Sequence, residues 1–206
     1  MVSPKDAKPL TENIVLYFLY CQAKKRGSKV FFKIKHTLSL ERISGRSPIT
    51  WFYFAPDVDM LEITPDNEII GYETKGQRKG KTGYKWPSLY QGLDEALFYL
   101  RLPYIRPREL EGGVIDKVFV VHAHPSPEKI EKDEKLGLRI YELTPIGFIC
   151  VMPQGKIIKL VEAKNNPLLD RDAKTFFLQN LDTLENFSEN SRTFRQIRER
   201  GEDFLK

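Results

Sequence analysis

Apolar positions in the first part of the chain follow two spacings, one typical of helices and one of strands. Residues 12–25 carry apolar side chains at helical spacing and end in a polar stretch before Gly27, a residue common just past helix ends. Thr11 stands where a helix cap is expected. Residues 29–35 and 49–54 are rich in β-branched and aromatic residues, which favour strands. This region is therefore predicted to form a helix followed by two strands.

A tight polar turn then joins two short apolar segments. The turn spans residues 65–67, and the segments span residues 60–63 and 68–74. The turn consists of proline, aspartate and asparagine, which all stabilise turn conformations, so the pattern predicts a β-hairpin.

The remainder of the chain alternates between helix and strand signals. Residues 76–86 are rich in glycine and cations and are predicted to form a loop, and a helix is predicted from about residue 89 to 101. The nearly continuous apolar run at 117–122 predicts a buried strand. Three further strands are predicted at 138–143, 147–152 and 156–162, with a helical tail from about residue 170.

This order of elements predicts an α/β fold with a mixed central β-sheet flanked by helices, followed by extra C-terminal strands and a helical tail. The 206 residues are enough for one domain with a sizeable core. We expect a single domain over residues 1–206, with its core at about 11–123 and a C-terminal extension at about 137–206.

Composition narrows the class of protein. Hydrophobic residues make up 41% of the chain, which favours a globular fold, and the net charge of +5 favours a polyanionic partner. Apolar stretches are too short to span a bilayer, so no membrane partner is expected. Cys21 and Cys150 are far apart, which predicts free thiols in a reducing, cytoplasmic compartment. The chain has no P-loop motif, so no nucleotide cofactor is expected.

The predicted hairpin brings acids and a lysine together. Its register follows if Thr64 pairs with Glu68 across the turn. Asp59 then falls opposite Glu73, and directly opposed residues point to the same side of a sheet. Lys75 lies two residues beyond Glu73 and shares its face. A slip of one residue would separate the acids, so the predicted site depends on this register.

In the same register Asp57 falls opposite Lys75, which leaves both Asp57 and Asp59 as candidate metal ligands. Hard cations such as Mg²⁺ prefer carboxylate oxygens, and a bound cation lowers the pKa of its water and offsets charge on a phosphate. A neighbouring lysine can orient the attacking water. The hairpin therefore predicts a divalent-cation site that acts on phosphate.

An acid two residues before a lysine is a common pattern and most often forms a solvated surface pair. Other instances in this chain are Asp6, Asp133, Glu162 and Asp172. Glu162 ends a predicted strand, but its expected partner strand, residues 147–152, contains no carboxylate. Of these acids, Glu73 alone has carboxylates at matching positions on the neighbouring predicted strand.

Pro56-Asp57 together with Glu73-Thr74-Lys75 matches the signature of the PD-(D/E)xK nuclease superfamily, which the chain resembles over about residues 11–123. Within it, the chain looks most similar to archaeal Holliday-junction resolvases and related archaeal or viral nucleases. The resemblance implies a restriction-endonuclease-like α-β-β-β-α-β core. In that branch the metal aspartate directly precedes the apolar strand, so the implied metal ligands are Asp59 and Glu73, with Asp57 as a fallback.

The resemblance also implies three catalytic residues. They are Lys75, Glu12 on the first helix and Gln91 on the helix after the lysine. Glu12 has a second interpretation, as a first-turn acid that is favourable to the helix dipole. Gln91 has a second interpretation as a surface or packing residue.

Four cations in the predicted loop lie between glycines and two aromatic residues, directly after Lys75. They are Arg78, Lys79, Lys81 and Lys85. Arginine and lysine neutralise phosphate, glycine lets the backbone approach it, and aromatic rings stack on bases. We expect these cations to bind nucleic acid; an ordinary surface loop is the alternative.

Together these features predict a nuclease that depends on Mg²⁺ or Mn²⁺ and hydrolyses DNA. The resemblance implies an endonuclease acting on branched or double-stranded DNA, working as a homodimer because junction-cutting relatives cleave paired strands. One alternative is a non-catalytic nucleic-acid-binding module on the same fold. Another is a protein–protein adaptor whose charges are purely structural.

Overall fold

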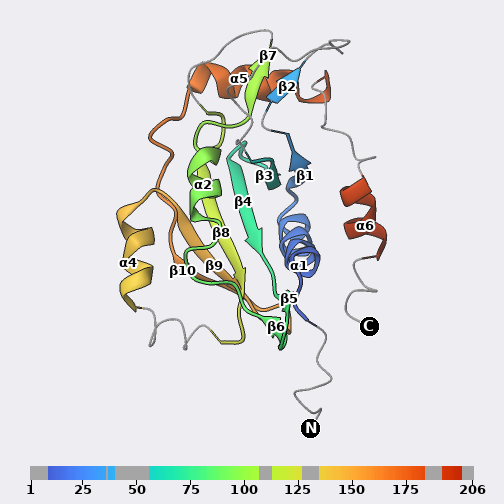
Figure 1. Ribbon diagram of the computed structural model, residues 1–206. Coiled ribbons are helices and arrows are strands. Elements are labelled where there is room, and N and C mark those ends of the chain that lie inside the picture. Colours follow the sequence, from blue (N-terminus) through green and yellow to red (C-terminus); the bar gives the residue numbers. More distant parts are fainter. Residues whose placement is uncertain are drawn as a thin grey trace.

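A six-stranded mixed β-sheet forms the centre of the computed structural model, which describes residues 9–35, 37–39, 56–106, 113–126, 135–183 and 192–200 (Figure 1). Its strands are, in spatial order, β1 (Lys29–Ile34), β3 (Val58–Ile63), β4 (Ile69–Lys75), β8 (Lys117–Ala123), β9 (Gly147–Val151) and β10 (Ile157–Val161). Strand β8 runs parallel to β4 and β9, and the other neighbours are antiparallel. The predicted strand at 49–54 lies outside the described residues.

Helices cover both faces of this sheet, which confirms the predicted fold class. Helix α1 (Glu12–Lys25) contacts β1, β4 and β8, while α2 (Leu93–Tyr99) contacts β4 and β8 from the other face. The order α1, β1, β3, β4, α2, β8 is the α-β-β-β-α-β order predicted. No helix within the described ranges is long and apolar enough to cross a membrane.

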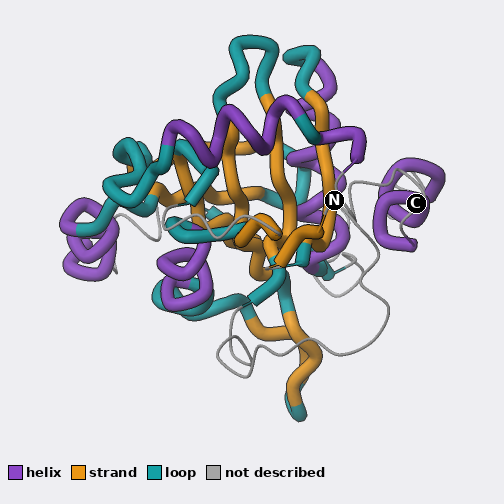
Figure 2. Tube along the Cα trace, turned by 90° about the horizontal axis from the view of Figure 1, so that it is seen from above, coloured by secondary structure: helices purple, strands orange, loops and turns teal. Residues whose placement is uncertain are grey.

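The C-terminal part adds strands to the sheet and helices around it. Helix α4 (Lys135–Leu143) packs beside β9 and β10, and α6 (Arg192–Arg200) packs beside α1 and β1, so the two helices lie at opposite margins of the molecule (Figure 2). The remaining helical elements are α5 (Arg171–Gln179) and the 3₁₀ turn η2 (Leu181–Thr183). The predicted strands at 147–152 and 156–162 and the helical tail are confirmed by β9, β10, α5 and α6.

Two small sheets complete the described elements. Strands β2 (Thr37–Ser39) and β7 (Tyr104–Arg106) pair in parallel. Strands β5 (Arg78–Gly80) and β6 (Gly83–Lys85) form an antiparallel ribbon at the end of the sheet where β4 ends (Figure 1). The prediction of a plain loop over residues 76–86 is therefore wrong, because the glycines at its centre allow a tight hairpin turn.

The sheet separates two apolar cores. On one face Val15, Leu16 and Leu19 of α1 pack with Met60 and with other apolar residues of the strands. On the opposite face, α2 contributes Ala96 and Tyr99, which pack with Val118 and Val120 of β8. Strands β4 and β8 are almost wholly buried because both of their faces are covered.

The structure differs from the predictions at three places, in a helix start, an element type and a helix cap. The predicted helix at 89–101 begins only at Leu93, because Gly92 adopts a left-handed conformation with φ of 89°. The predicted strand at 138–143 is instead part of helix α4, where Gly137 and Tyr141 lie one turn apart and are both buried. Thr11 precedes α1 as expected, but its side chain makes no capping hydrogen bond.

A wholly buried acid ties the end of α1 to the hairpin. Glu62 on β3 accepts hydrogen bonds from the Arg26 guanidinium (2.8 and 2.9 Å), from Ser28 Oγ (2.7 Å) and from the Tyr72 hydroxyl (2.6 Å). A buried carboxylate is tolerated when its oxygens are engaged in this way. Glu62 therefore has a structural role that fixes α1 over the sheet.

The residues that follow β4 hydrogen-bond to the segment that precedes α1 and pack against its first turn. The Gln77 amide donates to the Leu10 carbonyl (2.8 Å), and the Leu10 amide donates to Gln77 Oε1 (2.7 Å). A Cβ atom added at Gly76 would lie 2.1 Å from the Glu12 backbone nitrogen. Glycine at position 76 therefore lets the first turn of α1 approach the end of β4.

We expect Gly76→Ala to lower the free energy of unfolding by about 1–3 kcal/mol, because the added methyl group overlaps the backbone of α1. Urea denaturation of both proteins measures this difference. Gly80→Ala is the control, because an added Cβ at that position first meets the flexible end of the exposed Lys85 side chain (3.0 Å). Equal losses in the two variants would contradict the close approach at Gly76.

Candidate active site

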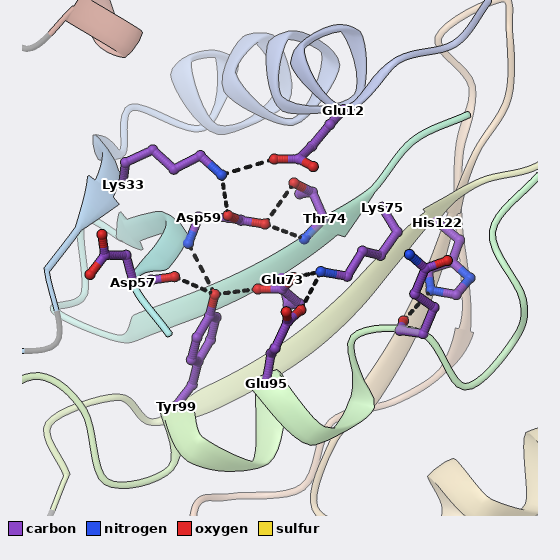
Figure 3. A network of polar contacts seen from close by, with 11 residues as sticks. Glu12, Lys33, Asp57, Asp59, Glu73, Thr74, Lys75, Glu95, Tyr99 and His122 are labelled. Carbon is purple, nitrogen blue, oxygen red and sulfur yellow. Dashed lines mark hydrogen bonds and ion pairs between the residues drawn. The ribbon is translucent and has the colours of Figure 1, made fainter. Parts of the chain in front are cut away.

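The hairpin of β3 and β4 has the predicted register. Met60 lies opposite Tyr72 and Ile63 opposite Ile69, and the Thr64 amide donates to the Glu68 carbonyl (2.9 Å). The turn and the apolar pattern therefore bring the start of β3 beside the end of β4, and the paired residues stop at Met60 and Tyr72, one position short of Asp59 and Glu73. Figure 3 shows the polar side chains gathered there.

The Asp59 side chain connects β3 to β4 just beyond the last backbone-paired residues of the two strands. Its Oδ2 accepts hydrogen bonds from the Thr74 amide (2.8 Å) and from Thr74 Oγ1 (2.9 Å). Its Oδ1 forms an ion pair with Lys33 of β1. The Asp59 carboxylate is thus oriented from two sides while only 6% of the residue is exposed.

Glu73 and Lys75 share a face, as their spacing predicts, and form an ion pair. The Lys75 ammonium also pairs with Glu95 of α2. A Cβ atom added at Gly92 would lie 2.9 Å from Lys75 Cε and 3.0 Å from Glu73 Cγ. The glycine before α2 therefore lets the chain pack directly onto this pair.

Tyr99 connects the two strand ends from below. Its buried hydroxyl lies within hydrogen-bond distance of Glu73 Oε2 and of the Asp57 carbonyl (2.8 Å), and it accepts from the Asp59 amide (3.2 Å). Glu95 and Tyr99 are four residues apart and therefore lie on the same face of α2. This face carries both contacts to Glu73 and Lys75.

Glu12 reaches the cluster through a second lysine. Lys33 Nζ lies 2.8 Å from Glu12 Oε1 and also pairs with Asp59. Helix α1 therefore contributes a carboxylate from one face of the sheet, and α2 contributes Glu95 from the other. We refer to Glu12, Lys33, Asp59, Glu73, Lys75 and Glu95 as the carboxylate–lysine cluster.

Two predicted site residues lie elsewhere. The side chain of Asp57 is exposed and points away from Lys75, and only its carbonyl contacts Tyr99, so Asp57 does not act as the predicted partner opposite Lys75 (Figure 3). The expected pairing fails because β3 pairs with β4 only from Met60 onwards, so residue 57 is outside the paired segment.

Gln91 is not on a helix but in the turn before α2. Its carbonyl contacts His122 Nε2 (2.8 Å), and its side-chain oxygen, when oriented towards Arg78, accepts from the guanidinium (3.0 and 3.2 Å). Gln91 therefore links the β5–β6 ribbon to β8 and has no described bond to the cluster carboxylates. The prediction that it lies on a helix is wrong, because Gly92 breaks the helical pattern before Leu93.

Burial and neighbouring charges together set the pKa values in the cluster. Burial, the hydrogen bond to Glu95 and the charge of Asp59 together raise the pKa of Glu73 to about 9. The hydrogen bond with Glu73 and the contact with Lys75 outweigh burial and lower the pKa of Glu95. Burial alone would lower the pKa of Lys33, but pairing with Asp59 and Glu12 raises it above its ordinary value.

The donor chemistry fits a hard divalent cation. Four acidic side chains share two ammonium groups: Lys33 pairs with Glu12 and Asp59, and Lys75 pairs with Glu73 and Glu95. Within the described ranges, no group of three or more histidine, cysteine, aspartate or glutamate side chains is placed so that it could hold a metal ion. Mg²⁺ characteristically binds one or two protein carboxylates and keeps several waters. Asp59 and Glu73 are the candidate ligands for that mode.

Three residues of this site were not found by the sequence analysis. Glu95 and Tyr99 had a usable signal, since both lie on the face of a helix predicted to follow Lys75. Lys33 had none, because its strand gives no indication that its side chain reaches the hairpin. Its position is set by a backbone φ of 51°.

His122 lies next to the site on β8 but is buried and uncharged. Its ring contacts the Gln91 carbonyl and stands edge-on to the Phe148 ring at 5.0 Å between centroids. Burial lowers its pKa to about 4, with smaller contributions from the positive charges of Lys75 and His124. An unfolded histidine has a pKa of about 6.5.

Because unfolding raises the pKa of His122, the unfolded chain binds more protons at acid pH. We expect the free energy of unfolding to fall by roughly 3 kcal/mol through this group as the pH drops from about 6.5 to 4, and no contribution above pH 7. Urea denaturation at several pH values should show a smaller fall for His122→Gln than for the parent. His124→Gln is the control and should retain most of the fall, because the charge of His124 is only a minor cause of the lowered pKa of His122; an unchanged profile in His122→Gln would contradict the assignment.

Comparison of the chain with protein-family models, with curated proteins and with solved structures finds no match. The function is therefore argued from the geometry and charge of the carboxylate–lysine cluster and its surroundings.

Proposed function

We propose that the protein is a metal-dependent nuclease that hydrolyses phosphodiester bonds in DNA, as an endonuclease acting on branched or double-stranded DNA. The observation that carries the proposal is that Asp59, Glu73 and Lys75 lie near the open end of one hairpin, in a cluster where four acidic side chains share two lysines. These are the residue types that hold a hard cation beside a lysine.

Asp59 and Glu73 would hold the cation, Mg²⁺ or Mn²⁺. When bound, such a cation lowers the pKa of its water and offsets charge on a phosphate oxygen. The protein groups supply orientation: Thr74 holds the Asp59 carboxylate, and Tyr99 holds that of Glu73. Preorganised groups of this kind need no rearrangement during the reaction.

Lys75 would orient the attacking water and attract the charge that develops on the phosphate. Glu95 holds its ammonium group from α2. The innermost residues are buried, but the side chains of Glu12, Lys33 and Glu95 are 35%, 36% and 39% exposed. A phosphate would therefore approach over this polar rim.

The β5–β6 ribbon supports DNA as the substrate. It starts three residues after Lys75, and Arg78 lies opposite Lys85, so two cations share one face. Lys79 lies opposite Tyr84 on the other face. All four of these residues and Lys81 in the turn are exposed. Two-stranded ribbons of this type fit the major groove of a duplex.

Assembly and compartment are part of the same proposal. Cutting of paired strands needs two active sites, so we propose a homodimer. Cys21 and Cys150 form no disulfide in the structure, which supports a reducing, cytoplasmic compartment.

The first experiment tests the cluster. The parent protein should nick plasmid or four-way-junction DNA in the presence of Mg²⁺ or Mn²⁺, and excess chelator should abolish this cleavage. Glu73→Gln and Lys75→Met should each lower the rate by at least about a hundredfold, because each removes a charge aimed at the reacting phosphate or its cation. Gel assays at saturating metal measure the rates.

Glu162→Gln is the matched control, since Glu162-Ala163-Lys164 repeats the acid-x-lysine spacing away from the cluster. Its rate should equal that of the parent. Cleavage that persists in Glu73→Gln or in excess chelator would refute the nuclease assignment. DNA binding without any metal-dependent cleavage would favour a non-catalytic nucleic-acid-binding module instead.

The second experiment tests the ribbon. In a Glu73→Gln background, the pair Lys79→Ala and Lys81→Ala should weaken binding to duplex DNA and reduce the slope of log affinity against log salt by about 0.9 for each lost phosphate contact. Fluorescence anisotropy at several salt concentrations measures this slope. Lys24→Ala with Lys25→Ala, at the far end of α1, removes the same charge and should leave the slope unchanged. An equal effect in both pairs would contradict a specific role for the ribbon.

A further inference from the structure

Lys33 has an unusual backbone conformation for its position. It lies inside β1, yet its φ of 51° is in the left-handed region, where residues with a Cβ atom are disfavoured. Such conformations persist only where the surrounding structure enforces them, and they are concentrated at functional sites.

This conformation changes the direction of the strand's side chains. Phe32 and Ile34 are two residues apart and would face the same side of a regular strand. Instead, Phe32 packs in the core beneath α1, and Ile34 packs in the core on the α2 face. The switch occurs at Lys33, whose side chain then extends to Asp59 at the start of β3 (Figure 3).

At that point the Lys33 ammonium joins two carboxylates from different elements. It lies 2.8 Å from Glu12 Oε1 of α1 and pairs with Asp59 Oδ1 of β3. Thr74 holds the other Asp59 oxygen, so Lys33 occupies the one that faces the rim. Because its side chain is 36% exposed, Lys33 can leave this position without disrupting the core.

The arrangement mirrors that of Lys75. Lys75 joins Glu73 to the glutamate of α2, and Lys33 joins Asp59 to the glutamate of α1. Each of the two carboxylates proposed to hold the cation therefore already has an ammonium group on one oxygen. The acid-x-lysine pattern of the hairpin accounts for Lys75 alone and does not require a second lysine in contact with Asp59.

We propose that Lys33 is a positioning residue that holds Asp59 and Glu12 in the cation-free protein and competes with the divalent cation for Asp59. The inference rests on the proposed function in one respect, that Asp59 is a ligand of the cation. Removal of the Lys33 charge leaves Asp59 oriented by Thr74 and increases the negative charge of the cluster. Divalent cations should then bind more tightly.

The test is an isothermal titration calorimetry experiment in which Mn²⁺ is titrated into the full-length protein without DNA. Lys33→Asn keeps a residue that tolerates the left-handed backbone. We expect its Kd for Mn²⁺ to be about three- to tenfold lower than that of the parent, because one positive charge near the ion is lost. Lys33→Gly fits the same backbone and should give the same shift, which provides a second variant if the first folds poorly. Lys33→Arg retains the charge and should retain the parent Kd.

Lys29→Asn is the matched control, since it removes an exposed lysine at the other end of β1. An equal shift in that variant, or a Kd that is unchanged or raised in folded Lys33→Asn and Lys33→Gly, would overturn the inference. Absence of Mn²⁺ binding in the parent and in both variants would also overturn it.

The outcome is separable from that of the nuclease proposal. A parent protein that cleaves DNA with metal, but whose Lys33 variants keep the parent Kd, would overturn the role of Lys33 alone. Conversely, the expected shift in Kd without cleavage of any DNA would support Lys33 and overturn the nuclease proposal.

Discussion

The structure depends on the compensation of four carboxylates by two lysines at the end of the β3–β4 hairpin. Burial raises the pKa of Glu73, and the hydrogen bond to Glu95 and the charge of Asp59 raise it further. Lys33 and Lys75 each join a carboxylate of the sheet to one of a covering helix. The same contacts therefore stabilise the charges and hold α1 and α2 against opposite faces of the sheet.

Two glycines make this crowding possible. Gly76 admits the first turn of α1, and Gly92 admits the turn before α2 against the side chains of Glu73 and Lys75. A side chain at either position would separate a helix from the strand ends. Close backbone approach, rather than a large cavity, brings the polar groups of three layers together. Such a site has little freedom to rearrange, which suits a role in orienting a cation and a phosphate.

The hairpin and its site pair were predictable because their signals are local. The polar turn after Ile63 sets the register, and alternation along β4 places Glu73 and Lys75 on one face. Prediction of the 138–143 segment as a strand failed because a short apolar pattern fits both spacings. There, burial of Tyr141 against the sheet decides for a helix. The prediction that Gln91 lies on a helix was wrong for a related reason, since the spacing of apolar residues does not reveal the left-handed conformation of Gly92.

The sequence by itself determined the class of fold, the hairpin with its register, and the shared face of Glu73 and Lys75, because turn chemistry and side-chain alternation act over a few residues. Tertiary structure alone decided that Lys33 joins Asp59 to the first helix and that α2 presents a further carboxylate. Those contacts link segments that are far apart in the chain and depend on how closely backbones pack. No local pattern of apolar and polar residues records that distance.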